Sequence, residues 1–253
     1  MIRFLVLLMI FSQLAMANDY LDVPSRDFTV DDAQCKAEGM AEIDVLFVYE
    51  PEFAGTIDQL SDEWVSEINL IYQSSGVKLK MYKAGTVKRF IKADNFYGKL
   101  HRLRGDKQIE KLRDYLEADF VVGVVSKSEG DKANVVGLAY KGIRPQFAYS
   151  IVRGRVSART VAHELGHNMG LGHGELQKSD GTLYPWGRGY GIPGKYATVM
   201  GYSQLYPAPS VLRFSNPDID CNGVPCGVSE TREDGANSAL AINCVRFLVS
   251  SFR

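Results

Sequence analysis

The chain has 253 residues, of which 45% are hydrophobic and 23% are charged, so a low-complexity disordered protein is excluded. Its 29 basic and 30 acidic residues give a net charge of −1, without the basic excess that nucleic-acid binding normally requires. No apolar run reaches the about 20 residues of a bilayer-spanning helix. We therefore expect neither a nucleic-acid partner nor a membrane span in the mature chain.

Residues 1–17 have the pattern of a secretory signal peptide. Arg3 supplies the positive charge, residues 4–15 are mostly apolar, and Ala15-Met16-Ala17 is a small-x-small cleavage sequence. The alternative interpretation is a buried N-terminal helix. The signal-peptide interpretation predicts a protein that is secreted or periplasmic.

Four cysteines remain after the predicted cleavage, and an even number in an oxidising compartment favours two disulfide bonds. Cys221 and Cys226 flank a turn-like segment, Asn222 to Pro225, so we prefer a local bond between them. Cys35 would then pair with Cys244. A second possibility is that Cys35 is a free thiol that caps a metal ion in a zymogen.

Residues 18–42 form a polar N-terminal extension, and the chain then alternates predicted strands and helices as far as residue 169. The expected strands lie at 43–49, 77–82, 86–91, 119–125, 135–140 and 147–152. The expected helices lie at 56–75, 106–117 and 160–169. This order predicts an α+β fold with a mixed sheet packed by helices.

The last third of the chain has a different character. Residues 174–232 are rich in Gly, Pro and Tyr and lack periodicity, so we expect ordered loops and short strands. A closing helix is expected at 233–252. These features predict one domain over 43–253, with an upper lobe at 43–173 and a lower lobe at 174–253.

The chemistry is concentrated in His163-Glu-Leu-Gly-His-Asn-Met-Gly-Leu-Gly-His173, which holds three of the four histidines. On a helix, His163 and His167 project from the same face one turn apart and can ligate one Zn²⁺. His173 becomes the third ligand if the chain turns at Gly170, where positive φ carries no penalty. Glu164 is rotated around the helix axis, from where it reaches a water at the metal. His101 has no assigned role.

This motif resembles the signature of the metzincin zinc endopeptidases. The resemblance implies a zincin fold, in which a twisted mixed sheet and an active-site helix precede an irregular lobe with a Met-turn and a closing helix. The segment Ala197-Thr-Val-Met-Gly-Tyr202 is similar to the Met-turn. Met200 would then lie beneath the single zinc ion as a hydrophobic base and not as a ligand.

Two further segments, Val136–Tyr140 and Arg213–Pro217, resemble the reprolysin-like group that includes the bacterial peptidyl-Asp metalloendopeptidases. This resemblance implies cleavage of internal peptide bonds before acidic residues, and hence a cation in the substrate pocket. Arg213 is the better candidate and Arg188 the weaker one. The residue after the third histidine, Gly174, departs from the better-known metzincin groups.

The predicted mechanism uses Glu164 as the general base that takes a proton from the attacking water. Tyr202 resembles the Tyr of the Met-x-Tyr sequence in astacins and serralysins, which implies stabilisation of the transition state. The alternative for Tyr202 is a buried structural residue. Protein or peptide substrates would lie extended along an edge strand at 147–152.

We expect the protein to be a monomer. A second hypothesis for its function is an exported zinc-binding toxin, effector or adhesion module with narrow or no proteolysis. The presence of Glu164 argues against a purely binding role, because a binding module does not need that carboxylate.

Overall fold

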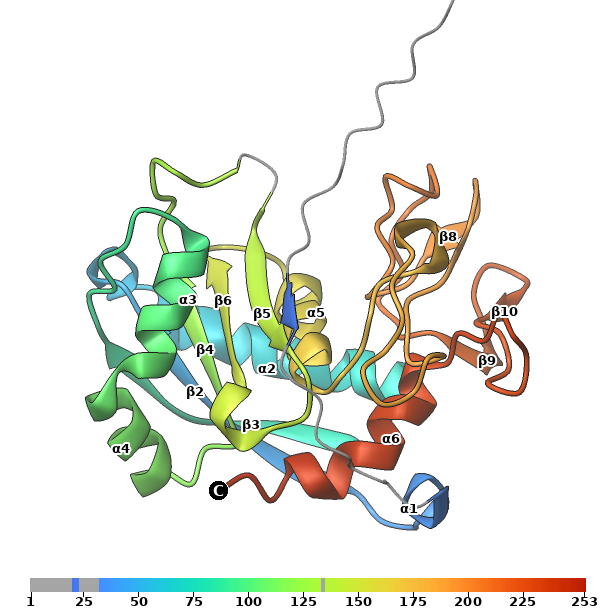
Figure 1. The fold of residues 1–253 in the computed structure, drawn as a ribbon, viewed down its shortest axis with the longest axis horizontal. Coiled ribbons are helices and arrows are strands. Elements are labelled where there is room, and N and C mark those ends of the chain that lie inside the picture. Colours follow the sequence, from blue (N-terminus) through green and yellow to red (C-terminus); the bar gives the residue numbers. More distant parts are fainter. Residues whose placement is uncertain (1–19, 23–31, 133–134) are drawn as a thin grey trace, which may run out of the picture.

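A computed structural model of the chain describes residues 20–22, 32–132 and 135–253, so the predicted signal peptide lies outside the described residues. Its centre is a six-stranded sheet with the order β1-β5-β6-β4-β2-β3 (Figure 1). The strands are β1 (Tyr20–Asp22), β2 (Ala41–Tyr49), β3 (Leu79–Lys88), β4 (Phe120–Val125), β5 (Gly137–Lys141) and β6 (Tyr149–Arg153). Strands β6, β4, β2 and β3 are parallel, β5 is antiparallel to β6, and β1 is parallel to β5.

Helices cover both faces of this sheet, and the alternation of side chains in β2 explains the two layers. Ile43, Val45 and Phe47 belong to a core shared with α2, α5 and α6, whereas Leu46 and Val48 belong to a core shared with α3 and α4. The helices are α1 (Asp32–Lys36), α2 (Ile57–Ser74), α3 (Phe96–Gly105), α4 (Lys107–Tyr115), α5 (Ala158–Asn168) and α6 (Ser238–Val249). Single-turn 3₁₀ helices lie at Pro51–Phe53, Pro145–Phe147 and Glu175–Gln177. The predicted α+β fold with a mixed sheet is confirmed.

Sequence periodicity did not predict α3. This helix begins after Asn95, whose side chain accepts a hydrogen bond from the Gly98 N–H at 2.9 Å. Its sequence, FYGKLHRLRG, contains an internal glycine and many cations, so its apolar stripe is weak. The Asn95 cap was the available signal.

Two predictions about strands were wrong. The two strands predicted at 77–82 and 86–91 are replaced by a single strand, β3, which covers only Leu79–Lys88 and pairs with β2 along its whole length despite one irregularity in register. The predicted edge strand at 147–152 corresponds to β6, which lies between β4 and β5 inside the sheet. Its hydrogen-bonding groups are therefore already used, and a peptide cannot add to it.

The lower lobe contains little regular structure. Strand β7 (Gly191–Ile192) pairs with β8 (Tyr196–Ala197), and β9 (Asn216–Asp220) pairs with β10 (Pro225–Cys226). The closing helix α6 begins at Ser238 and not at 233, because the Asn237 side chain caps it by accepting from the Leu240 N–H. The residues before it form a turn closed by a bridge between Val228 and Ala236.

Both predicted disulfide bonds are present. Cys221–Cys226 joins neighbouring parts of the β9–β10 hairpin, and Cys35–Cys244 joins α1 to α6. The second bond rules out a free Cys35 thiol that caps a metal ion. Within the described residues, no helix has both the length and the apolar character needed to cross a membrane.

The two disulfide bonds provide a matched stability test. Cys35–Cys244 spans 209 residues and Cys221–Cys226 only 5, so the first restricts the unfolded chain far more. We expect C35S/C244S to lower the free energy of unfolding by about 2–5 kcal/mol. The matched variant C221S/C226S should lower it less, and an equal loss in urea denaturation would contradict this account.

Candidate metal centre

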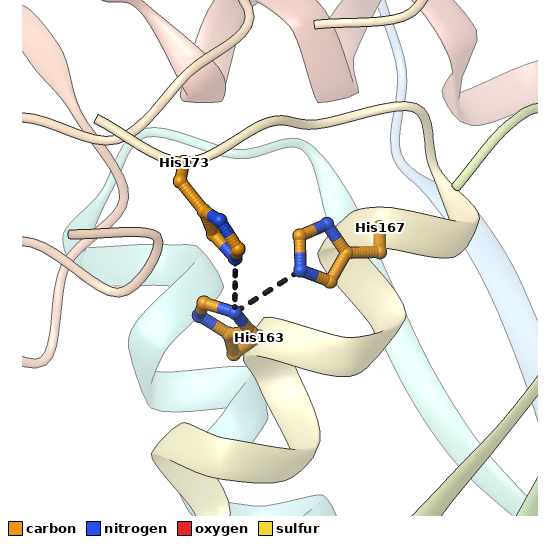
Figure 2. A group of neighbouring side chains, drawn as sticks. All are labelled: His163, His167 and His173. Carbon is orange, nitrogen blue, oxygen red and sulfur yellow. Dashed lines mark hydrogen bonds between the residues drawn. The ribbon is translucent and has the colours of Figure 1, made fainter. Parts of the chain in front are cut away.

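The first two histidines of the motif lie on α5, which is buried along almost its whole length. Val161 and Leu165 anchor the helix in the core, and both are fully buried. Because His163 and His167 are four residues apart, their imidazoles project from the same face (Figure 2). Asn168 fixes the end of the helix, since its side-chain amide donates to the carbonyl oxygens of Tyr140 and Tyr149.

Gly170 turns the chain and brings the third histidine to the first two. Its φ is +84°, and the N–H groups of Gly170 and Leu171 donate to the His167 and Gly166 carbonyls, each at 2.9 Å. As a result the Nε2 atom of His163 lies 3.2 Å from that of His173 and 3.1 Å from that of His167 (Figure 2). All three residues are buried, and their possible ligand atoms lie within 4.8 Å of one another.

Hydrogen bonds at the Nδ1 atoms of two histidines favour the tautomer in which Nε2 can bind a metal. His163 Nδ1 lies 2.9 Å from the carbonyl oxygen of Val199, and His167 Nδ1 lies 2.9 Å from that of Leu171. A carbonyl oxygen only accepts, so each Nδ1 must carry the proton. The Nε2 lone pairs then point at one another, an arrangement that a shared cation stabilises.

His173 Nδ1 contacts the side-chain amide of Gln177, with 3.1 Å between Nδ1 and Nε2. The Gln177 Oε1 atom is buried and has no hydrogen-bond partner among the described residues. Rotating this amide by 180° lets Oε1 accept from a protonated Nδ1, which leaves the His173 Nε2 lone pair for a metal. The three imidazoles and their partners therefore fit a metal ion.

Glu164 lies on the side of α5 that faces strand β5 of the sheet. Its side chain is buried, and Gly137 in β5 provides the space, because a Cβ there would lie only 2.1 Å from Glu164 Oε1. Any larger residue at 137 would displace the carboxylate. No motif in the sequence indicated this role of Gly137.

The predicted Met-turn lies directly against α5. A Cβ on Gly166 would lie 2.7 Å from Met200 Sδ, so the glycine permits this close packing. Arg159 holds the turn from the same helix, since its Nη2 donates to the carbonyl oxygens of Thr198 at 2.9 Å and Gly201 at 2.7 Å. Arg159 lies one turn before His163 on the same face of α5, and this spacing was the signal in the sequence for its contact with the Met-turn.

The Tyr202 ring lies against two of the metal-ligand candidates. Its centroid is 5.8 Å from that of His163 and 4.8 Å from that of His173. Burial lowers the pKa of the Arg159 guanidinium, and Tyr202 partly offsets this effect. Tyr202 and Arg159 are therefore electrostatic neighbours at the metal centre.

The other residues singled out in the sequence are Arg213, Arg188 and His101, and each has hydrogen-bond partners of its own. Arg213 donates through its side chain to the carbonyl oxygen of Asp220 at the end of β9, and its own carbonyl oxygen accepts from Val199 in the Met-turn. Arg188 is buried and donates to the Gly235 carbonyl oxygen at 2.9 Å. His101 is on α3, where its Nδ1 contacts the Tyr140 hydroxyl at 2.9 Å, outside the histidine cluster.

Comparison with known families agrees with this geometry. Residues 61–174, which include all three histidines, match the model of the reprolysin-like metallopeptidases of family M12B. Over residues 61–174 the chain is thus similar to the reprolysin-like metallopeptidases.

Curated bacterial relatives are named peptidyl-Asp metalloendopeptidase. The one from Pseudomonas aeruginosa is 28% identical, with 83% of this chain and 40% of the relative covered. The one from Xanthomonas campestris pv. campestris is 26% identical, with 92% of this chain and 56% of the relative covered. The chain thus spans about half the length of these relatives.

A solved structure described as a chaperone–substrate complex shares the fold. Its TM-score is 0.71 at 20% identity, with 86% of this chain and 40% of that chain covered. At this identity the likeness extends to the fold alone.

Replacement of Arg159 tests its hold on the Met-turn. In Arg159→Met, the Thr198 and Gly201 carbonyl oxygens lose a charged donor, and we expect the free energy of unfolding to fall by about 1.5–3 kcal/mol. Urea denaturation measures the change. Arg155→Met is the matched control, because Arg155 is exposed in the turn before α5 and its replacement should cost almost nothing. Equal stabilities of the two variants would contradict the role of Arg159.

Proposed function

We propose that the protein is a zinc-dependent metalloendopeptidase. The observation that carries this proposal is the convergence of three buried imidazoles on one point, with the Glu164 carboxylate on the same helix. Three neutral histidines are one of the ligand sets that hold a catalytic zinc with one open position. The M12B domain match and the endopeptidase names of the relatives support the same conclusion.

Side chains of the protein supply the proton transfer and the charge stabilisation that peptide hydrolysis requires. A bound zinc ion contributes Lewis-acid chemistry at the site. Glu164, held against Gly137, accepts the proton of the attacking water and returns it to the leaving amine. Tyr202 is proposed to donate its hydroxyl hydrogen to the oxygen of the scissile carbonyl as negative charge develops there. The contacts of its ring with His163 and His173 support this role.

Replacement of Glu164 separates catalysis from metal binding. We expect Glu164→Gln to lower kcat/KM on a denatured protein substrate by about 10²–10⁴-fold, because an amide cannot accept the water proton. Zinc content should stay at one ion per chain, since the three histidines are unchanged. Both are measured on the same preparation, by cleavage assay and metal analysis.

Glu175→Gln is the matched control, because Glu175 is an exposed carboxylate just two residues after His173. It should retain cleavage within about twofold, as surface substitutions usually do. Full activity of Glu164→Gln would disprove the proposed mechanism.

We also propose that cleavage favours acidic residues after the scissile bond. The printed name of the relatives, peptidyl-Asp metalloendopeptidase, supports this preference. Arg213 remains our candidate cation, because its backbone is bonded to the Met-turn beside the catalytic groups. Its guanidinium donates to a neutral carbonyl oxygen, so its charge is not already matched by that partner.

A peptide library with a randomised residue after the cut tests this preference. We expect Arg213→Ala to lower the Asp-over-Ala preference roughly tenfold or more, the equivalent of one hydrogen bond to a charged group. Arg232→Ala is the control, because Arg232 is exposed and pairs with Asp234 at 2.7 Å. A wild-type preference for apolar residues would contradict the acidic specificity. An unchanged preference in Arg213→Ala would contradict the role of Arg213 only.

We further propose that the protein acts outside the cytoplasm as a monomer. The two disulfide bonds support an oxidising compartment. The predicted signal peptide supports the same location.

A further inference from the structure

The strand beside the histidine cluster, β5, carries a buried cation that the catalytic mechanism does not use. The Lys141 side chain is only 10% exposed, and its Nζ lies 3.0 Å from Asp22 Oδ1. The same ammonium group lies 4.3 Å from the centre of the Tyr20 ring. Both partners belong to β1, so the charge of Lys141 is balanced mainly by a segment far away in the sequence.

Strand β1 occupies the outer edge of β5. Tyr20, Leu21 and Asp22 pair in register with Ala139, Tyr140 and Lys141. Without β1, β5 would be the sheet edge nearest the metal centre, and its free backbone groups could pair with an extended peptide. Figure 1 shows β1 next to β5 and in front of α5.

Tyr20 extends this contact to the candidate metal ligands. Its ring centre lies 4.9 Å from that of His167 and 5.2 Å from that of His173. Its hydroxyl lies 3.3 Å from Ser179 Oγ, which also accepts a hydrogen bond from the His173 N–H. The segment Tyr20–Asp22 thus covers one side of the catalytic centre with a strand, an aromatic ring and a carboxylate.

We propose that Lys141 on β5 is a specificity-determining residue that binds an acidic side chain of the peptide, and that Tyr20–Asp22 is its internal competitor. This proposal rests on the proposed endopeptidase function, because the peptide that competes with β1 is the substrate. The chemical class of the ligand is an extended peptide with an acidic residue two positions from the one that covers His167 and His173.

The surroundings of Lys141 favour an anionic ligand at this place. Apart from Asp22, the polar contact of its Nζ among the described residues is the Asp180 carbonyl oxygen at 3.4 Å, a long and uncharged partner. A buried ammonium group is costly without a nearby anion. When β1 leaves, an acidic substrate side chain can replace the Asp22 carboxylate at the same place.

The attachment of β1 is weak enough to be exchanged. It has three residues, and the Asp22 side chain remains 71% exposed despite its ion pair. Such a short edge strand is only marginally stable, but its covalent connection gives it a high effective concentration at β5. A substrate therefore meets a partly occupied site, and its apparent affinity becomes weaker as the fraction of chains with β1 displaced becomes smaller.

Peptide binding to the full-length Glu164→Gln chain tests the subsite without cleavage. The probe is a fluorescent peptide that contains Tyr-Leu-Asp, and its partner contains Tyr-Leu-Asn. In Asp22→Lys, repulsion from Lys141 should displace β1, so the Asp peptide should bind about three- to tenfold more tightly. Lys141→Met should remove the preference for the Asp peptide over the Asn peptide.

Glu38→Lys is the matched control, because it makes the same charge change at an exposed ion pair with Lys78. It should leave both affinities unchanged. In the active chain, Asp22→Lys should lower KM for an acidic peptide by a similar factor. An unchanged affinity in Asp22→Lys, or an Asp preference that persists in Lys141→Met, would overturn the proposal.

The two proposals can fail separately. If the wild-type chain with zinc cleaves no peptide but β1 still competes with the Asp peptide, the endopeptidase function fails and the subsite stands. If the chain cleaves peptides and loses cleavage in Glu164→Gln, but β1 does not compete, the subsite fails and the function stands.

Discussion

The site depends on burying three imidazoles so that their Nε2 atoms face one another at 3.1–3.2 Å. With Nδ1 protons committed to the carbonyl oxygens of Val199 and Leu171, the lone pairs of His163 and His167 converge in a space from which water is largely excluded. Such an arrangement is unfavourable without a cation. The surrounding structure must therefore hold each ring in place through contacts away from its Nε2 atom. Hydrogen bonds at Nδ1 and the close packing that several glycines permit provide these contacts.

Three glycines make the assembly of the site possible. Gly170 reverses the chain so that His173 returns to α5, and Gly166 lets the sulfur of Met200 lie against the helix. Gly137 leaves room for the Glu164 carboxylate beside β5. In each case a side chain larger than hydrogen would either strain the backbone or displace a group of the site. The metal centre is thus assembled from the sheet, the helix and the lower lobe together.

The sheet also determines how a peptide can reach this centre. Because β6 is an interior strand, the antiparallel strand β5 is the one that faces the catalytic groups. In this structure its outer edge pairs with Tyr20–Asp22, and the Asp22 carboxylate neutralises Lys141. These contacts of the short N-terminal strand are the ones that the proposed substrate would make, with a backbone that adds to the sheet and a negative charge near Lys141.

The sequence by itself determined the cluster of three histidines, the turn at Gly170 and the α+β class, and it favoured the two disulfide pairings that the structure contains. These features depend on local spacing or on a small number of possible pairings, which a sequence expresses directly. Only the tertiary structure decided which strand forms the sheet edge, that Arg159 holds the Met-turn, and that Lys141 pairs with Asp22 from more than a hundred residues away. Strand order and long-range ion pairs arise from the packing of the whole chain, and no periodicity within β5, β6 or β1 specifies them.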